Sequence, residues 1–226
     1  MAKNEVRQSL RSIESAAIAG ILYSVLAVVS LLLFRTIPVD SGSIETLSTW
    51  FGDAENRRNL IIGANLASLA AIALLWFVAV IRRRMGNRED KFFSTVFLGS
   101  AILYIAMWLV AAAAIASIAV AYERFPDSTI STASLTFLVG FAESLVLIVG
   151  LRLQGAFVLT TSTLILRTEM YPKWLAYFGY IMGLLMLLLP MVYNPIGIAF
   201  PMWVLIVSVT TLISKATTTT TPGPLA

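Results

Sequence analysis

Long apolar runs constrain this chain more than any other feature of its sequence. Six of them approach or exceed the roughly 20 residues that a helix needs to cross a bilayer. A soluble domain of 226 residues cannot hide them, because 58% of the residues are hydrophobic and only 12% are charged, against about 25% charged in typical soluble proteins. The predicted membrane spans are residues 16–34, 60–81, 92–121, 135–166, 174–192 and 196–214.

These runs predict an all-α, polytopic transmembrane helical bundle of six spans, since none alternates strictly between apolar and polar residues as a half-buried strand does. Residues 92–121 exceed the thickness of the hydrocarbon core, so this helix tilts or protrudes. Residues 135–166 are longer still and either continue past the inner face or break near Gly150 or Gly155. Pro172 ends that helix, because proline cannot continue it.

Basic residues between the spans predict the orientation of the chain. Eleven of the sixteen Lys and Arg residues fall on one side of the spans and four on the other, while Arg152 lies within a span. This asymmetry is the positive-inside signature and places both termini in the cytoplasm. We expect a multi-pass protein of the plasma membrane, the inner membrane of a bacterium. The net charge of +4 then reflects topology and indicates no nucleic-acid partner.

The predicted domain organisation is a bundle of residues 16–214 with short polar segments around it. Residues 1–15 form a basic cytoplasmic segment, and residues 215–226 form a disordered, Thr-rich tail. Residues 35–59 form an extracytoplasmic loop.

Within that loop, apolar residues fall at helical spacing and predict a short helix at the membrane interface. This helix either covers the edge of the bundle or serves as a gating or partner-docking element. The residues that carry the spacing are Ile44, Leu47, Trp50 and Phe51.

Cysteine and histidine are both absent from the chain. Their absence excludes disulfides, iron–sulfur clusters, Cys/His zinc sites and histidine-based catalytic triads. No phosphate-binding glycine loop and no G-x-S-x-G motif is present either. We therefore expect no cofactor, no metal and no catalytic residue in this chain.

Glu143 is a carboxyl group inside an apolar run, where an ionised group is costly. On an ideal helix it shares one face with Thr136, Gln154 and two glycines, and such a face belongs toward other helices. Asn65 of the second span is its predicted partner. These four polar residues are either interhelical hydrogen-bonding groups or an intramembrane site that handles a proton, an ion or a ligand.

Arg152 lies nine residues after Glu143, which places it on the opposite face of an ideal helix, about 13.5 Å farther along the axis. Counted from residue 135, it falls close to the inner headgroups. Its side chain then reaches lipid phosphate, pairs with another subunit, or contributes to a site.

Arg82, Arg83 and Arg84 stop the second span abruptly on its cytoplasmic side. A basic cluster at this position either binds anionic lipid headgroups or only anchors the topology.

Two other patterns have both a packing and a functional interpretation. Gly179 and Gly183 form a G-x-x-x-G motif, which packs helices within one chain or dimerises the protein. Four aromatic residues of the spans pack in the core or line a cavity: Tyr104, Trp108, Tyr180 and Trp203.

Two stretches resemble bacterial six-helix integral membrane proteins of unknown function. One is AAIAGILYSVLAVVSLLLF in the first span. The other leads into the fifth span and matches at Arg167, Pro172, Lys173, Trp174, Leu175 and Gly179. The resemblance covers about a fifth of the chain, and it implies a bacterial six-span fold without implying an activity.

We expect a non-catalytic accessory or scaffold subunit of a larger membrane complex, because the loops are small and catalytic residue types are scarce. The alternative function is a carrier of a small solute, an ion or a proton that uses Glu143 in the bundle interior. The expected partners are membrane lipids and other membrane protein subunits, or a second copy of this chain.

Overall fold

The structure is a computed structural model that describes residues 2–39, 44–85, 91–125, 130–168, 172–189 and 197–219. Within these ranges every regular element is a helix, which confirms the predicted all-α fold. The elements are α1 (Ala2–Phe34), α2 (Ile44–Gly52), α3 (Ala54–Met85), α4 (Lys91–Arg124), α5 (Thr132–Glu143), the π-helix η3 (Ser144–Gly150), α6 (Leu151–Thr168), α7 (Lys173–Leu188) and α8 (Ala199–Thr219). The tail after residue 219 lies outside the described residues.

Four helical segments are long and apolar enough to cross a membrane: Ala17–Phe34, Ala54–Arg82, Phe93–Arg124 and Thr132–Arg167. They correspond to the first four predicted spans. The apolar stretches of α7, Lys173–Leu188, and of the part of α8 whose side chains are described, Ala199–Ile213, are shorter than this criterion requires. The structure thus shows four of the six predicted spans by length and composition.

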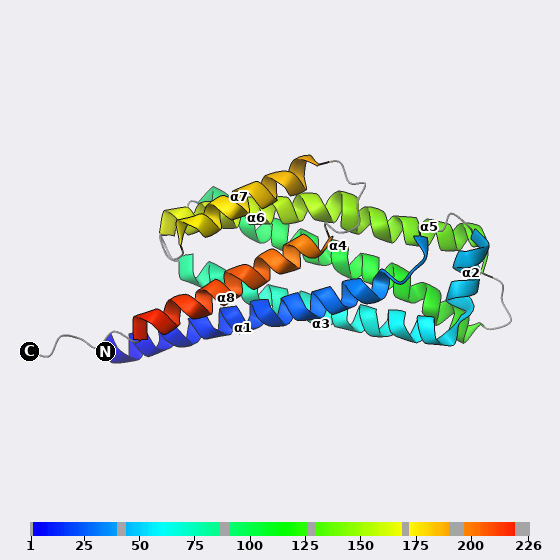
Figure 1. The fold of residues 1–226 in the computed structure, drawn as a ribbon, viewed down its shortest axis with the longest axis horizontal. Coiled ribbons are helices and arrows are strands. Elements are labelled where there is room, and N and C mark those ends of the chain that lie inside the picture. Colours follow the sequence, from blue (N-terminus) through cyan, green and yellow to red (C-terminus); the bar gives the residue numbers. More distant parts are fainter. Residues whose placement is uncertain are drawn as a thin grey trace, which may run out of the picture.

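The long helices run side by side along the molecule, whereas α7 and α8 accompany only part of its length (Figure 1). Both short helices lie toward the end that holds the N-terminus, and α2 crosses the other end, which we call the α2 end. Side-chain contacts agree, since Phe200 at the start of α8 packs against Tyr23 and Tyr104, well inside α1 and α4. Beyond that level, α7 and α8 leave one side of the bundle uncovered.

Glycines let the short helices approach the long ones closely. A Cβ atom on Gly155 of α6 would lie 2.9 Å from the carbonyl oxygen of Gly183 in α7, which is backbone and cannot move aside cheaply. Ser162 of α6 likewise fills the space beside Gly179. Both glycines of the G-x-x-x-G motif therefore pack within the chain, where small residues allow backbones to meet.

The fourth apolar segment contains a π-helix, which takes the place of the predicted break near Gly150. In a π-helix the backbone turns more widely than in an α-helix. Glycine ends this stretch because a Cβ atom at residue 150 would lie 3.0 Å from the carbonyl oxygen of Leu145.

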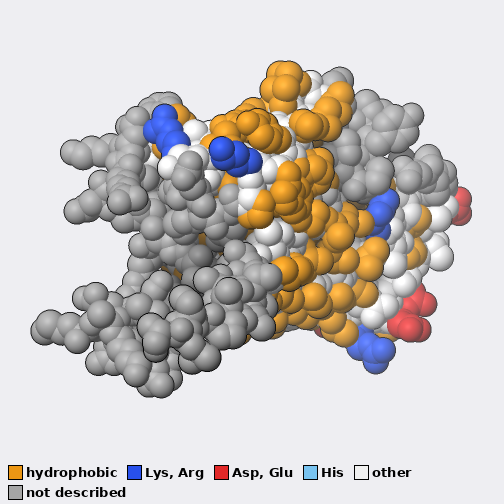
Figure 2. Space-filling view, turned by 60° about the vertical axis from the view of Figure 1, so that its left-hand side comes forward, with side chains coloured by type: hydrophobic (Ala, Val, Ile, Leu, Met, Phe, Trp, Pro, Cys, Tyr) orange, Lys and Arg blue, Asp and Glu red, His pale blue; other side chains and the backbone are white. Residues whose placement is uncertain are grey.

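The short helix predicted in the loop is α2. Its residues Leu47 and Phe51 are buried against α3, α4 and α5, so α2 covers the end of the bundle (Figure 1). On the outside, large apolar side chains are exposed along the long helices, with Ile18 61% and Trp76 63% exposed. Figure 2 shows them as a belt, with acidic side chains gathered beyond it at one end.

Candidate functional site

Glu143 is the last residue of α5 and immediately precedes the π-helix. Its side chain is half-buried and lines a cavity of about 130 Å³. Four parts of the chain line this cavity: the end of α1 with the residues after it, the middle of α4, the α5–η3 junction, and Gly197 and Ile198 just before α8. The cavity therefore lies where the short helices stop, on the side toward the α2 end.

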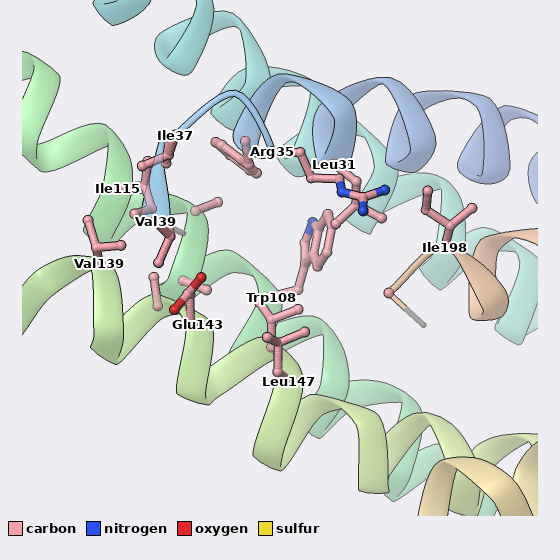
Figure 3. Close-up of a pocket in the computed structure, with 16 residues that line it drawn as sticks. Leu31, Arg35, Ile37, Val39, Trp108, Ile115, Val139, Glu143, Leu147 and Ile198 are labelled. Atoms are coloured by element: carbon pink, nitrogen blue, oxygen red, sulfur yellow. The ribbon is translucent and has the colours of Figure 1, made fainter. Parts of the chain in front are cut away.

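Three polar side chains interrupt an otherwise apolar wall. Arg35 directly follows α1, Trp108 lies in the middle of α4, and Glu143 lies across the cavity from α1. In Figure 3 the indole ring of Trp108 stands between the guanidinium group of Arg35 and the carboxylate of Glu143. A mostly apolar pocket with a few polar groups is the usual form of a small-molecule site.

The indole N–H of Trp108 is a buried donor without an acceptor in the described part of the chain. The side chain is 6% exposed. A buried donor that lacks a partner costs roughly 1–3 kcal/mol. An occupant of the cavity that offers an acceptor to this N–H would recover that cost.

Two of the residues predicted to accompany Glu143 lie elsewhere. Asn65 is exposed on α3, and its amide donates to the carbonyl oxygen of Ile61 at 2.8 Å. Thr136 is exposed on α5 and donates to the carbonyl oxygen of Thr132 at 2.9 Å. Each side chain hydrogen-bonds to a carbonyl oxygen of its own helix, and neither lines the cavity.

Gln154 is buried, but it belongs to a different polar cluster. It lies beside the hydroxyl group of Tyr104, which is 3.3 Å from the hydroxyl oxygen of Tyr23. The π-helix explains why Gln154 and Glu143 do not lie on the same face of the segment. Its wider turn takes up about one extra residue, which rotates the following helix by roughly 100°. The predicted single polar stripe is therefore divided between two places.

Arg152 lies near the middle of the bundle, because Gly150 and Gln154 on either side of it both neighbour Tyr104 of α4. Its depth in a membrane, predicted to be near the inner headgroups, stays a prediction. Its Nη1 donates to the carbonyl oxygens of Leu147 at 3.3 Å and Ile148 at 3.1 Å. The guanidinium group thus binds carbonyls of the π-helix and points toward the α2 end. Contact with lipid phosphate or another subunit stays a prediction.

The basic cluster lies at the opposite end of α3 from α2. Arg82 is exposed there, and the side chains of Arg83 and Arg84 lie outside the described part of the structure. Lipid binding by these three residues stays a prediction.

Sequence reasoning placed Glu143 in the bundle but missed Arg35 as a pocket residue. Of the four aromatic residues considered for a cavity, Trp108 alone lines this one. The sequence could have indicated Arg35 as a candidate, because it is the first charged residue after a predicted span and so is expected at the end of the bundle. Nothing in the sequence brings Ile198 to the same place, because that contact depends on where α8 begins.

No group of His, Cys, Asp and Glu residues suited to a metal ion occurs among the described residues. No family model matches this chain, and the comparisons with curated proteins and with solved structures find no match either. The resemblance to bacterial six-helix proteins therefore stays a prediction, and function must be argued from the site.

Proposed function

We propose that this chain is a multi-pass membrane protein that binds a small solute in the cavity beside Glu143, and that it acts as a carrier of that solute. The protein is non-catalytic, requires no cofactor and resides in the bacterial plasma membrane. The observation that carries the proposal is the cavity itself: an apolar space with one cation, one carboxylate and one unpartnered indole N–H in its wall.

The short helices support this function. Membrane carriers place substrates near the membrane midplane, where interrupted or incomplete helices leave space and expose polar groups. Here the cavity begins where α8 begins, and the π-helix forms part of its wall. π-Helical turns occur often at functional sites.

The proposed topology has six spans with both termini in the cytoplasm. The helices α7 and α8 supply the fifth and sixth spans. These two spans return the C-terminus to the side of the N-terminus. The distribution of Lys and Arg along the chain supports the cytoplasmic location of that side.

Native mass spectrometry of protein extracted in mild detergent tests the function. We expect a small bound mass on the wild-type protein and its loss in Val146→Phe, because Val146 lines the cavity and a larger ring fills it. Val110→Phe is the matched control, since Val110 is 44% exposed on α4 outside the cavity. A bound mass that survives Val146→Phe, or its absence from the wild-type protein, contradicts the proposal.

A second candidate function is an accessory subunit of a membrane complex, and Arg152 favours it. An arginine within a membrane bundle is costly and is usually paired. In the described part of the structure, Arg152 donates two hydrogen bonds, both from Nη1 and both to carbonyl oxygens of its own segment. A carboxylate of another subunit would pair with its charge. In this case the same spectra show stoichiometric protein neighbours, and Arg152→Leu removes them. Neighbours that persist in Arg152→Leu count against a role of Arg152 in assembly.

A further inference from the structure

We propose that the cavity takes a small zwitterion with an apolar body, the size of a short amino acid, whose anionic end meets Arg35 and Trp108 and whose cationic end meets Glu143. This inference rests on the proposed solute-binding function and names the chemical class of the solute.

The charged groups in the wall of the cavity select the charges of the occupant. The cavity is lined by one guanidinium group and one carboxylate, which stand on opposite sides of the Trp108 ring in Figure 3. Arg35 is exposed at the mouth of the cavity, and Glu143 is half-buried farther in. A monoanion would meet only the guanidinium group and a monocation only the carboxylate, so neither would pair with both charged groups. An occupant with one charge of each sign leaves the site neutral.

Trp108 sets the direction in which the occupant binds. In Figure 3 its indole nitrogen lies on the edge of the ring that faces the Arg35 side of the cavity. An indole N–H donates only, and a guanidinium group donates only. Two donors on one side select an acceptor there, and a carboxylate provides two acceptor oxygens. The cationic end is then left for the side of Glu143.

The size and lining of the cavity set the body of the occupant. A cavity of about 150 Å³ lined by Leu, Ile and Phe holds a benzene molecule, so a cavity of about 130 Å³ holds roughly six to eight non-hydrogen atoms. The remaining wall is aliphatic or aromatic, with Leu31, Ile115 and Val139 among its members. An amino acid with a branched aliphatic side chain fits this description.

Four ligands of nearly the same shape test the charges separately. They are L-valine, which is a zwitterion, 3-methylbutanoate, which lacks the ammonium group, L-valinamide, which lacks the carboxylate, and 3-methylbutanamide, which lacks both. Binding is measured by calorimetry on the full-length protein in lipid nanodiscs at pH 7. We expect valine to bind at least about tenfold more tightly than each of the others, since each of them loses at least one hydrogen bond between charged groups.

Three substitutions test which wall residues contact the anionic end of the ligand and which contact its cationic end. Arg35→Gln and Trp108→Phe should weaken valine and 3-methylbutanoate at least about fivefold and leave valinamide unchanged. Glu143→Gln should weaken valine and valinamide and leave 3-methylbutanoate unchanged. The matched controls should bind all four ligands as the wild-type protein does: Arg58→Gln at the same end of the bundle, Trp203→Phe at another unpartnered indole, and Glu123→Gln at the end of α4.

The same zwitterionic chemistry occurs in a free solute and in the headgroup of phosphatidylethanolamine. Nanodiscs of phosphatidylglycerol alone are therefore compared with nanodiscs that also contain phosphatidylethanolamine. Equal affinity for valine in both identifies a free solute, and weaker binding in the mixed nanodiscs identifies the headgroup.

Equal binding of valine and any one of the other three ligands overturns the zwitterion, and so does the absence of binding by all four ligands. Neither result removes the proposed function, which is decided by the bound mass on the wild-type protein and on Val146→Phe.

Discussion

Glu143 and Arg152 lie nine residues apart in one apolar segment, yet each meets a different environment. Glu143 faces a cavity whose other members come from α1, α4 and the start of α8. Arg152 stays on its own segment and donates to carbonyl oxygens of the π-helix. At the residue scale, a charge within a membrane helix is accommodated either by space shared between helices or by the local backbone.

At Glu143, replacement by glutamine should leave the fold intact. Glutamine keeps the shape of the side chain and carries no charge, and the guanidinium group of Arg35 is exposed, so its charge stays hydrated without the carboxylate. We expect the yield of folded, monodisperse protein and the melting temperature in detergent to match the wild-type values. A large drop in the yield of folded protein would show that the negative charge itself is required for folding.

For Arg152, replacement by leucine should lower the stability by about 1–3 kcal/mol, because two carbonyl oxygens of the π-helix lose a charged donor. We expect a lower melting temperature without loss of the folded state. Arg152→Lys supplies a control, as it keeps a cationic donor and should restore part of the difference. No change in melting temperature for the leucine variant would contradict the role assigned to these two bonds.

At the scale of elements, close contacts between glycines and neighbouring backbones hold the short hairpin against the long helices. Gly155 faces α7, whereas Gly140, in the same continuous segment, has no atom within 4 Å of the position of an added Cβ. The two positions look alike in the sequence, since both are glycines in an apolar helix. Their difference depends on which side of the segment α7 covers.

The variant Gly155→Ala should therefore destabilise the protein by about 1–3 kcal/mol, because α7 must shift away from the new methyl group. Gly140→Ala should be neutral or stabilising, since alanine is favoured over glycine in helices by up to about 1 kcal/mol. Thermal unfolding of both variants in the same detergent measures the difference. Equal melting temperatures would show that α6 and α7 do not depend on this contact.

The sequence predicted the elements better than it predicted the site. Apolar runs of sufficient length are a local signal, so the long helices and α2 were found close to their observed positions. Depth along the predicted spans favours Asn65 as the partner of Glu143, but Asn65 lies on an exposed side of α3. Ideal α-helical turns place Gln154 on the face of Glu143. The π-helix alters that geometry, and Arg35, Trp108 and Ile198 meet Glu143 only through packing between distant segments.

At the scale of the whole molecule, the proposed topology places α2 outside the cell and the start of α7 inside. The chain contains no cysteine, so single cysteines report on location without background. Thr49→Cys on α2 and Lys173→Cys on α7 introduce them at exposed positions. A membrane-impermeant maleimide should label the first in intact cells and the second only after permeabilisation. The reverse pattern would invert the topology.

The short hairpin of α7 and α8 also gives the molecule an uneven outline in a membrane. In the proposed topology the bundle is wider toward the end that holds the N-terminus than toward the α2 end, because α7 and α8 accompany the long helices over only part of their length (Figure 1). Such a body displaces more lipid area from one leaflet than from the other. It fits best where the leaflet with the larger displaced area lies on the convex side of a bend, so the hairpin that leaves room for the cavity also gives the protein a preferred membrane curvature.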